Sequence, residues 1–159
     1  MDRGTLAAYI TAEYDALLAV AYPSDDPAFN LEGPIYLVEN AISNALRLLG
    51  VPEAQQALPV IADSQVGDIY ALCDYYALRA LARKLATFAD VTIDMPKLQK
   101  MRSQIAAQAT LLLQDAEAEI AQRGYGKNAM QIGRLQLDFL EPTYGYGYGG
   151  ALLSPEGEW

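Results

Sequence analysis

The sequence predicts an all-α protein, a helical bundle of four main helices with a long extended C-terminal tail that contains a short strand. Three observations support this fold class. Apolar residues recur at spacings of three and four over most of residues 1–124, which is the period of a helix with one buried face. Proline and glycine separate these stretches. After residue 124 the helical period is lost, so we expect a helical body at 1–124 and a docking tail at 125–159.

The first two helices are marked by capping residues and prolines. Residues 5–21 are predicted to form the first helix, with Thr5 as its cap, and the proline-containing stretch 23–27 ends it. Pro34 suits the first turn of a second helix, because its missing N–H would be unpaired there anyway. Gly50 is a natural stop for that helix, and a short helical turn is expected at about 52–57.

Two long helices complete the predicted body. Asp63 or Ser64 is expected to cap a helix that runs to about residue 89 and is apolar on most sides, which predicts a central position. Asp94 is expected to cap the last helix, with Pro96 in its first turn and Gly124 at its end. Its apolar residues follow the spacing of a packing seam: Leu98, Met101, Ile105, Ala109, Leu112, Ala116 and Ile120.

The last 35 residues differ in character from the helical body. Residues 134–139 alternate polar and apolar side chains, which predicts a strand, and a glycine-spaced tyrosine repeat follows at 142–150. An isolated strand is not stable in water, so the tail is either disordered or pairs with another chain by strand addition. We expect a partner to be bound by its large apolar and aromatic side chains: Leu135, Leu137, Phe139, Tyr144, Tyr146, Tyr148 and Trp159.

Charge is unevenly distributed along the chain. The 11 basic and 20 acidic residues give a formal net charge of −9, which argues against nucleic acid as a tightly bound partner. The whole of this net charge lies in residues 1–78. For the basic residues of the middle we favour ion pairs with neighbouring helices or subunits over nucleic-acid binding, because acids surround them and no aromatic platform is interleaved. They form a predicted intersubunit patch: Arg79, Arg83, Lys84, Lys97, Lys100 and Arg102.

The sequence contains little that favours catalysis or a cofactor. Histidine, the commonest metal ligand and general acid–base group, is missing, and the single cysteine, Cys73, is interpreted as a buried small residue rather than a nucleophile. Asp115, Glu117 and Glu119 are interpreted as a solvated helix face rather than a hydrolase pair or a metal site. We expect no enzyme activity, no cofactor and no bound metal. A carboxylate-dependent hydrolase remains as an alternative.

Membrane and secretory classes are also disfavoured. No apolar run reaches the roughly 18 residues of a membrane span, and the first residues lack the basic-then-apolar order of a signal peptide. The chain of 159 residues is long enough for one domain with its own core, and its apolar share of 52% excludes disorder throughout.

Two segments of the helical body carry a family resemblance. Residues 71–81, ALCDYYALRAL, and the connection at 91–94 that leads into 104–109 lie in a small acidic helical domain followed by an extended tail. In this combination the chain resembles the head–tail connector (adaptor) proteins of tailed bacteriophages and gene transfer agents. The resemblance covers the architecture of most of residues 1–124 and includes no catalytic residue.

The resemblance implies a function that composition does not show. Such adaptors form a ring, typically of twelve copies, beneath the portal protein, with a stopper or tail-completion protein beyond it. DNA passes through the ring without specific binding, and the tail of each subunit commonly docks on the portal or on a neighbouring subunit. The protein would then reside in the neck of the virion after assembly in the host cytoplasm. A helical protein-binding module with a disordered tail, outside any virion, is the alternative.

Overall fold

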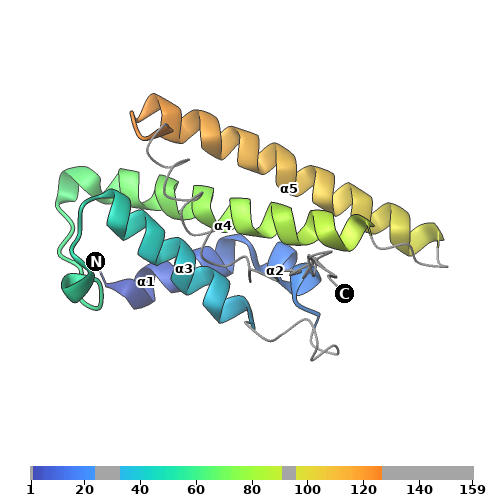
Figure 1. Cartoon of the computed structure of the whole chain (residues 1–159), viewed down its shortest axis with the longest axis horizontal. Helices are drawn as coiled ribbons and strands as arrows, with labels where there is room; N and C mark the ends of the chain where they lie inside the picture. Colours follow the sequence, from blue (N-terminus) through green and yellow to red (C-terminus); the bar gives the residue numbers. More distant parts are fainter. Residues whose placement is uncertain (1, 24–32, 91–95, 127–159) are drawn as a thin grey trace, which may run out of the picture.

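The computed structural model describes residues 2–23, 33–90 and 96–126 (Figure 1). In these ranges the chain is mostly helical and contains no strand, which confirms the predicted all-α body. The predicted strand at 134–139 and every predicted contact residue of the tail lie outside the described residues. The elements in chain order are α1 (Arg3–Glu13), α2 (Asp15–Ala21), α3 (Gly33–Leu48), the short 3-10 turns η1 (Glu53–Gln55) and η2 (Asp63–Gln65), α4 (Val66–Asp90) and α5 (Pro96–Gln122).

The first predicted helix is in fact two helices. The backbone of Tyr14 leaves helical geometry, with φ −112° and ψ 20°, so α1 ends before it and α2 begins after it. The prediction of Thr5 as the cap was also wrong. The N-cap is Asp2, whose Oδ1 accepts hydrogen bonds from the Thr5 backbone N–H at 2.7 Å and from the Thr5 hydroxyl at 2.8 Å. A carboxylate three residues before an unpaired helical N–H is well placed to cap it.

Glycine ends α3 and α5, as predicted. Gly50 has a φ of 79° and Gly124 a φ of 86°, a backbone region that other residues adopt only with strain. The N–H of Gly50 donates to the carbonyl of Arg47, and the N–H of Val51 donates to that of Leu46, which together form a Schellman motif. The same pair of backbone bonds closes α5 after Gly124.

Two other helix starts can be compared with the predictions. Pro34 and Pro96 lie in the first turns of α3 and α5, as predicted. Asp63 and Ser64, by contrast, lie inside η2, and α4 begins only at Val66, so neither residue caps the long helix. The 3-10 turn supplies the first backbone bonds before the α-helical register begins. Asp94 lies outside the described residues.

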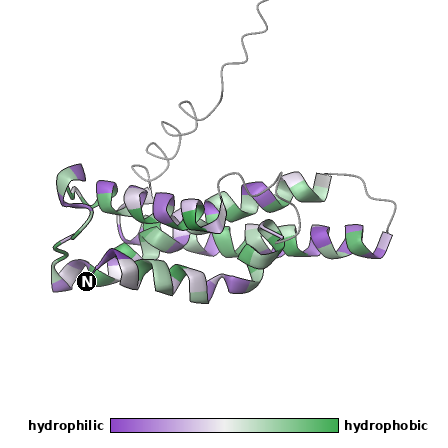
Figure 2. Ribbon diagram, turned by 90° about the horizontal axis from the view of Figure 1, so that it is seen from below, coloured by the Kyte–Doolittle hydropathy of each residue, from purple (hydrophilic) through white to green (hydrophobic). Residues whose placement is uncertain are grey.

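α4 is the central helix of the body, as its apolar faces predicted. It packs against α5 on one side and against α1, α2 and α3 on the other (Figure 1). Figure 2 shows the helices lying lengthwise beside one another, with hydrophilic residues spread over their outer faces. No helix within the described ranges is both long enough and apolar enough to cross a membrane. The fully buried side chains of α4 form the middle of the core: Ile69, Leu72, Cys73, Tyr75, Ala77, Leu81 and Leu85.

α4 and α5 form a long antiparallel hairpin. At one end Arg123 pairs with Asp68 at 2.9 Å, and toward the other end the Arg102 guanidinium lies over the Phe88 ring at 5.8 Å. We call the first end the hairpin base and define the hairpin tip as residues 79–90 and 96–102. With 27 residues, α5 is about 40 Å long, and its first turns extend past α2 and α3 (Figure 1).

The packing seam predicted on α5 is confirmed toward the base and weakens toward the tip. Ala109, Ala116 and Ile120 are buried, whereas Met101 is 47% exposed. The reason is that α5 contacts mainly α4, and near the tip the other helices no longer cover the hairpin (Figure 1). The tip therefore presents a surface that mixes apolar and basic side chains.

Candidate functional site

The fold brings the six predicted basic residues to one half of the α4–α5 hairpin, from Arg79 at the middle of α4 to Lys97 in the first turn of α5. The sequence separates them into two groups on either side of residues 91–95, and the antiparallel hairpin returns the second group beside the first (Figure 1). Between Tyr75 and Gln114 the sequence contains only two acids, Asp90 and Asp94. The tip is thus a cationic region of an acidic protein, built from Arg79, Arg83 and Lys84 of α4 and Lys97, Lys100 and Arg102 of α5.

Three of these six side chains are held against aromatic rings. Nζ of Lys84 lies 3.5 Å from the centroid of the Tyr22 ring, and the Arg79 guanidinium lies 5.8 Å from the centroid of Tyr75 and donates to its hydroxyl at 3.1 Å. Arg102 contacts a ring in the same way. Each cation–π contact at a partly exposed site contributes about 0.5–1 kcal/mol. The three rings come from two regions of the chain: Tyr22 follows α2, and Tyr75 and Phe88 both lie on α4.

Two of these three rings are buried and cannot stack on nucleic-acid bases. Tyr75 is 1% exposed and Phe88 is 8% exposed, so their faces are covered by the protein itself. Stacking on a base needs an accessible ring face. Tyr75 and Phe88 therefore offer no ring face to a base, whereas Tyr22 is only partly buried and lies under Lys84.

The other three basic side chains of the patch are exposed. Arg83 lies on α4, and Lys97 and Lys100 lie on the first turns of α5. They have no ring contact among the described residues, and the exposed Met101 is next to Lys100 in the sequence. These three are the cations of the tip that are open to a partner.

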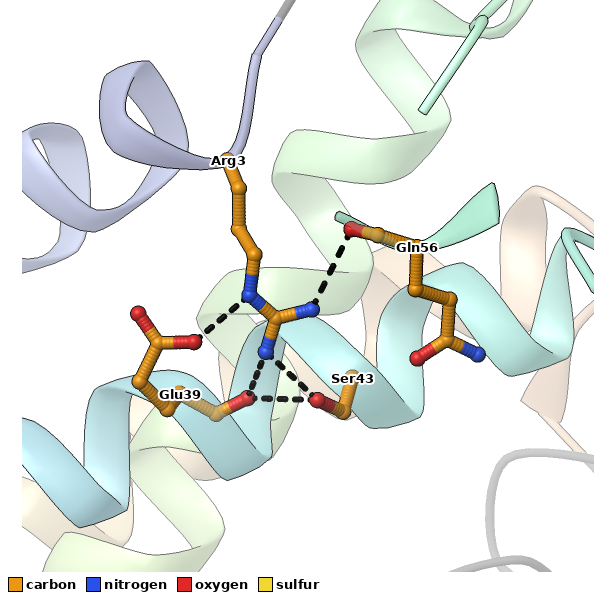
Figure 3. A network of polar contacts seen from close by, with 4 residues as sticks. All are labelled: Arg3, Glu39, Ser43 and Gln56. Carbon is orange, nitrogen blue, oxygen red and sulfur yellow. Dashed lines mark hydrogen bonds and ion pairs between the residues drawn. The ribbon is translucent and has the colours of Figure 1, made fainter. Parts of the chain in front are cut away.

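Several acids of the first half of the chain are already engaged within the molecule. Nε of Arg3 pairs with Oε2 of Glu39 at 2.6 Å (Figure 3). The same guanidinium donates to the Glu39 carbonyl at 2.9 Å, to the Ser43 hydroxyl at 2.6 Å and to the Gln56 carbonyl at 3.5 Å. This network joins the start of α1 to α3 and to the loop after η1 (Figure 3). The network therefore has a structural role, because it fixes the start of α1 against α3.

The hairpin base contains a second ion-pair network. Arg123 donates to Asp68 at 2.9 Å and to Glu119 at 2.9 Å, and the Tyr125 hydroxyl donates to Asp68 at 3.0 Å. These contacts hold the end of α5 against the beginning of α4. Glu39 and Asp68 are therefore poor candidates for an ion pair with a neighbouring subunit.

Asp74 is a half-buried carboxylate between α4 and α1. The Tyr9 hydroxyl donates to its Oδ2 at 2.9 Å. Burial raises the pKa of Asp74 above its usual value, the hydroxyls of Tyr14 and Tyr9 oppose this shift, and the nearby Glu13 and Glu119 add to it. A carboxyl group with a raised pKa is typical of catalytic acids, but it also arises in structural clusters. Here the tyrosine contacts make Asp74 a cross-link between two helices.

Cys73 lies in the core. Burial raises the pKa of its thiol to about 12, and the neighbouring Asp74 charge acts in the same direction. The thiol is therefore protonated at neutral pH, and the nucleophile is the thiolate. The interpretation of Cys73 as a buried small residue is confirmed.

Of the densest acids of the sequence, Asp115 and Glu119 are exposed on α5 near the base, whereas Glu117 is partly buried. A shallow open hollow there is lined by side chains of this single helix, and Glu119 is paired with Arg123 at 2.9 Å. Within the ranges that the structure covers, no three cysteine or acidic side chains are close enough to hold a metal ion. The lining supports a solvated helix face: Asp115, Ala118, Glu119, Gln122 and Arg123.

Sequence reasoning missed the exposure of several apolar residues: Ile35, predicted to lie in the buried stripe of the second helix, is 77% exposed at the start of α3, and two others are more exposed still. Leu58 is 79% exposed and Val60 is 89% exposed, and both lie in the loop between η1 and η2. Their only signal was that they flank Pro59 between two short turns, where no helical period assigns a buried face.

The hairpin tip is the candidate site that we carry forward. It combines three exposed cations, Arg83, Lys97 and Lys100, with the exposed Met101 on a helical hairpin that extends past the neighbouring helices (Figure 1). The tail residues predicted to bind a partner lie outside the described ranges, so the structure brings none of them to this site. No family model, curated protein or solved structure matches the chain.

Proposed function

We propose that this protein is a head–tail connector (adaptor), a structural virion protein without enzyme activity that forms a ring beneath the portal. The observation that carries the proposal is the separation of charge along the α4–α5 hairpin, which has a cationic tip and an acidic base. A ring of identical subunits needs two different surfaces on each subunit that fit one another. Opposite charge at the two ends of one hairpin supplies such a pair.

The acidic surface of this pair consists of exposed carboxylates. Glu39 and Asp68 are engaged in intrachain ion pairs and Asp74 is half-buried, so they contribute little to it. The described acids that are exposed and have no ion-pair partner are the candidates to face the tip of a neighbour: Asp2, Glu13, Asp15, Glu53, Asp63 and Asp115. Of these, only Asp115 lies on the hairpin itself.

The net charge suits a channel for DNA. Twelve copies of a chain with a charge of −9 would carry about −108. Duplex DNA has one phosphate charge per about 1.7 Å of its axis. A negative lumen repels the duplex and so lets it move through without specific binding. The ring would reside in the virion neck after assembly in the host cytoplasm.

The tail completes the proposal. Residues 134–139 would dock on the portal or on a neighbouring subunit by strand addition, with Tyr144, Tyr146, Tyr148 and Trp159 adding aromatic contacts. The described residues contain no strand and so offer no edge for this pairing. The pairing strand would then come from another tail, from the portal, or from the stopper or tail-completion protein.

The proposal is tested by mass and by imaging. The full chain, alone and co-expressed with the portal protein of its own particle, is analysed by native mass spectrometry and negative-stain electron microscopy. We expect a closed ring of about twelve copies that stacks on the portal. Both arms are needed, because ring proteins can remain monomeric until they meet a template. A strict monomer in the presence of portal would overturn the proposal.

A helical protein-binding module outside any virion is the second candidate. The exposed Leu58 and Val60 favour it, because they provide a contact surface on the body that does not need the tail. Deletion of residues 127–159 separates the two candidates, with circular dichroism as the check on folding. Ring assembly is lost if the protein is a connector, whereas the main interaction survives if the body is the binding module.

A further inference from the structure

We infer that two copies of this chain pair through the exposed face of α5, with the two helices antiparallel about a twofold axis near Gln108. The inference goes beyond the proposed function, because it needs neither a portal nor a ring. It describes how free subunits associate with one another before any larger assembly forms.

The side of α5 that points away from α4 is exposed along the length of the helix. α5 packs mainly against α4, and α1, α2 and α3 lie on the opposite side of α4 (Figure 1). Exposed residues of α5 recur at spacings of three and four, which places them on one face. We define the outer face of α5 by six of them: Lys97, Lys100, Gln104, Gln108, Leu111 and Asp115.

The middle of the outer face is uncharged. From residue 103 to residue 114 the sequence contains no acid and no base, although Gln104, Gln108 and Leu111 in this stretch are all exposed. A surface on a twofold axis meets its own copy, so a charge there would face a like charge. An amide both donates and accepts hydrogen bonds, so it can pair with an identical amide. The middle of the outer face therefore suits a contact with itself.

The charges at the two ends of the outer face complement one another in the antiparallel orientation. Lys97 and Lys100 precede the uncharged stretch, and Asp115 and Glu119 follow it. The midpoint of the uncharged stretch and the mean position of these four residues both fall at about residue 108. Antiparallel copies centred there place the lysines of each chain beside the carboxylates of the other. Parallel copies would place lysine beside lysine, which is repulsive.

The described contacts leave these charges available to a second copy. Lys97, Lys100 and Asp115 are exposed and have no ion-pair partner among the described residues. Glu119 pairs with Arg123 at 2.9 Å, and 49% of its side chain remains exposed. A twofold axis repeats every contact, so the attraction between Lys100 and Asp115 occurs twice in each pair of copies.

The pair and the proposed ring use the same charges in different ways. Neighbours in a ring contact one another through two different surfaces, whereas the twofold pair uses one surface twice and closes at two copies. Because Lys97, Lys100 and Asp115 belong to both contacts, a paired copy must separate before it joins a ring. The pair would therefore keep free subunits from forming a ring in the absence of the portal.

Cysteine cross-linking of the full chain tests the symmetry of the pair. Gln108→Cys places a thiol beside the axis, and Ser64→Cys places one at an exposed position of η2 as a control. A short bis-maleimide should link Gln108→Cys chains into dimers and should leave Ser64→Cys chains unlinked. Cys73 stays unmodified in both variants, because its thiol is buried and burial raises its pKa to about 12.

A mixture of two variants tests the orientation of the helices. In the antiparallel pair Gln104 of one copy lies opposite Leu111 of the other, whereas a parallel pair would set each residue beside itself. Gln104→Cys chains mixed with Leu111→Cys chains should therefore give mainly mixed dimers. Mainly self-linked dimers of each variant would contradict the antiparallel pair.

Charge reversal measures the contribution of the two ends. Lys100→Glu and Asp115→Lys should each raise the dimer dissociation constant at least about tenfold in sedimentation equilibrium, because each reversal acts twice in the pair. A chain that carries both reversals should return to within about threefold of the wild type. Arg47→Glu is the matched control and should leave the constant unchanged, because Arg47 is exposed on α3, which packs mainly against α4 and α1.

Several results would overturn the inference. One is a wild-type chain that stays monomeric at every concentration, and another is a mass that keeps growing beyond two copies. Equal cross-linking of Gln108→Cys and Ser64→Cys, or equal weakening by Lys100→Glu and Arg47→Glu, would also overturn it. If a reversal perturbs the circular dichroism, Lys100→Gln or Asp115→Asn replaces it.

The outcome is separable from that of the proposed function. A free subunit that is strictly monomeric but forms rings on the portal would remove the inference and leave the connector function intact. A twofold dimer that never assembles on the portal would do the opposite.

Discussion

The Tyr9 hydroxyl on α1 donates a hydrogen bond of 2.9 Å to Oδ2 of Asp74 on α4, across 65 residues of sequence. The Tyr9 ring also meets the edge of Tyr70 with 4.6 Å between centroids. The first helix is thereby fixed to the central helix by a polar contact inside an otherwise apolar interface. Burial raises the pKa of both groups, so the pair favours a neutral tyrosine beside a carboxyl that binds a proton more readily than usual.

Removal of the Tyr9 hydroxyl should destabilise the fold. The variant Tyr9→Phe leaves Oδ2 of Asp74 without this donor, and an unsatisfied polar group in a partly buried site costs about 1–3 kcal/mol. The free energy of unfolding from urea titration measures the change. Tyr36→Phe is the control, because Tyr36 is exposed and its change should stay within about 0.5 kcal/mol. Equal effects of the two variants would show that the Tyr9–Asp74 bond is not stabilising.

Asp74 should make stability depend on pH in a defined direction. Because its folded-state pKa is raised, the folded protein holds the proton more tightly than the unfolded chain. The stabilisation that Asp74 gives the folded state is fully present below the ordinary aspartate pKa of about 3.9. It is lost as the pH rises through the raised pKa of the folded state. In Asp74→Asn the free energy of unfolding should no longer fall as the pH rises through this range.

The measurement is the unfolding free energy of both proteins from about pH 2 to 7, a range that covers the windows of both a raised and a lowered aspartate pKa. Asp2 provides a control of opposite sign, because hydrogen bonds from Thr5 lower its pKa. The contribution of Asp2 is present above the ordinary aspartate pKa and is lost as the pH falls through its lowered value. An unchanged profile in Asp74→Asn would contradict the assignment.

Arg3 should be important for the attachment of α1. Arg3→Met keeps much of the aliphatic length but removes the bonds to Glu39, Ser43 and Gln56, and the expected cost is about 1–3 kcal/mol. Arg3→Lys should recover only part of this, because an ammonium group lacks the planar fork of donors that a guanidinium offers. Thermal and urea unfolding measure both. Arg47→Met, at an exposed position of α3, is the matched control and should be nearly neutral.

Gly124 and Gly4 should respond oppositely to alanine. Gly124→Ala forces a side chain into a φ of 86° and should cost about 1–2 kcal/mol. Gly4 lies inside α1, where an added Cβ meets Oδ1 of Asp2 at an ordinary 3.4 Å. Gly4→Ala should therefore stabilise by about 0.5–1 kcal/mol through helix propensity. A pair of equal shifts in unfolding free energy would refute this reading of the two glycines.

Local signals in the sequence predicted a helix end correctly where only one residue type suits the backbone conformation. Gly50 and Gly124 end helices because glycine alone adopts positive φ without strain. Prediction failed where more than one nearby residue could take the same structural role. Asp2 rather than Thr5 caps α1, and the pattern at 5–21 gave no signal for the break at Tyr14, because its apolar spacing continues across it.

For the candidate site, the six basic residues were identifiable from the sequence, but their surroundings were not. Tyr22 lies 62 residues before Lys84 along the chain, and only the packing of α2 beside α4 brings its ring under that ammonium group. The contact of Arg102 with Phe88 joins α5 to α4, whereas Arg79 contacts Tyr75 four residues earlier on the same helix. The exposed Leu58 and Val60 escaped prediction because a loop has no period from which burial can be inferred.

The sequence by itself determined the all-α class, the central position of α4, two helix ends and the separation of basic from acidic residues, because all of these depend on neighbours within a few positions. The tertiary structure decided which charges are engaged. An antiparallel hairpin brings together residues that are far apart in sequence, so Asp68 is paired with Arg123 while Lys97 and Lys100 remain exposed at the opposite end. Contact between distant residues depends on how the helices cross and pack, and the local periodicity of a sequence does not determine that packing.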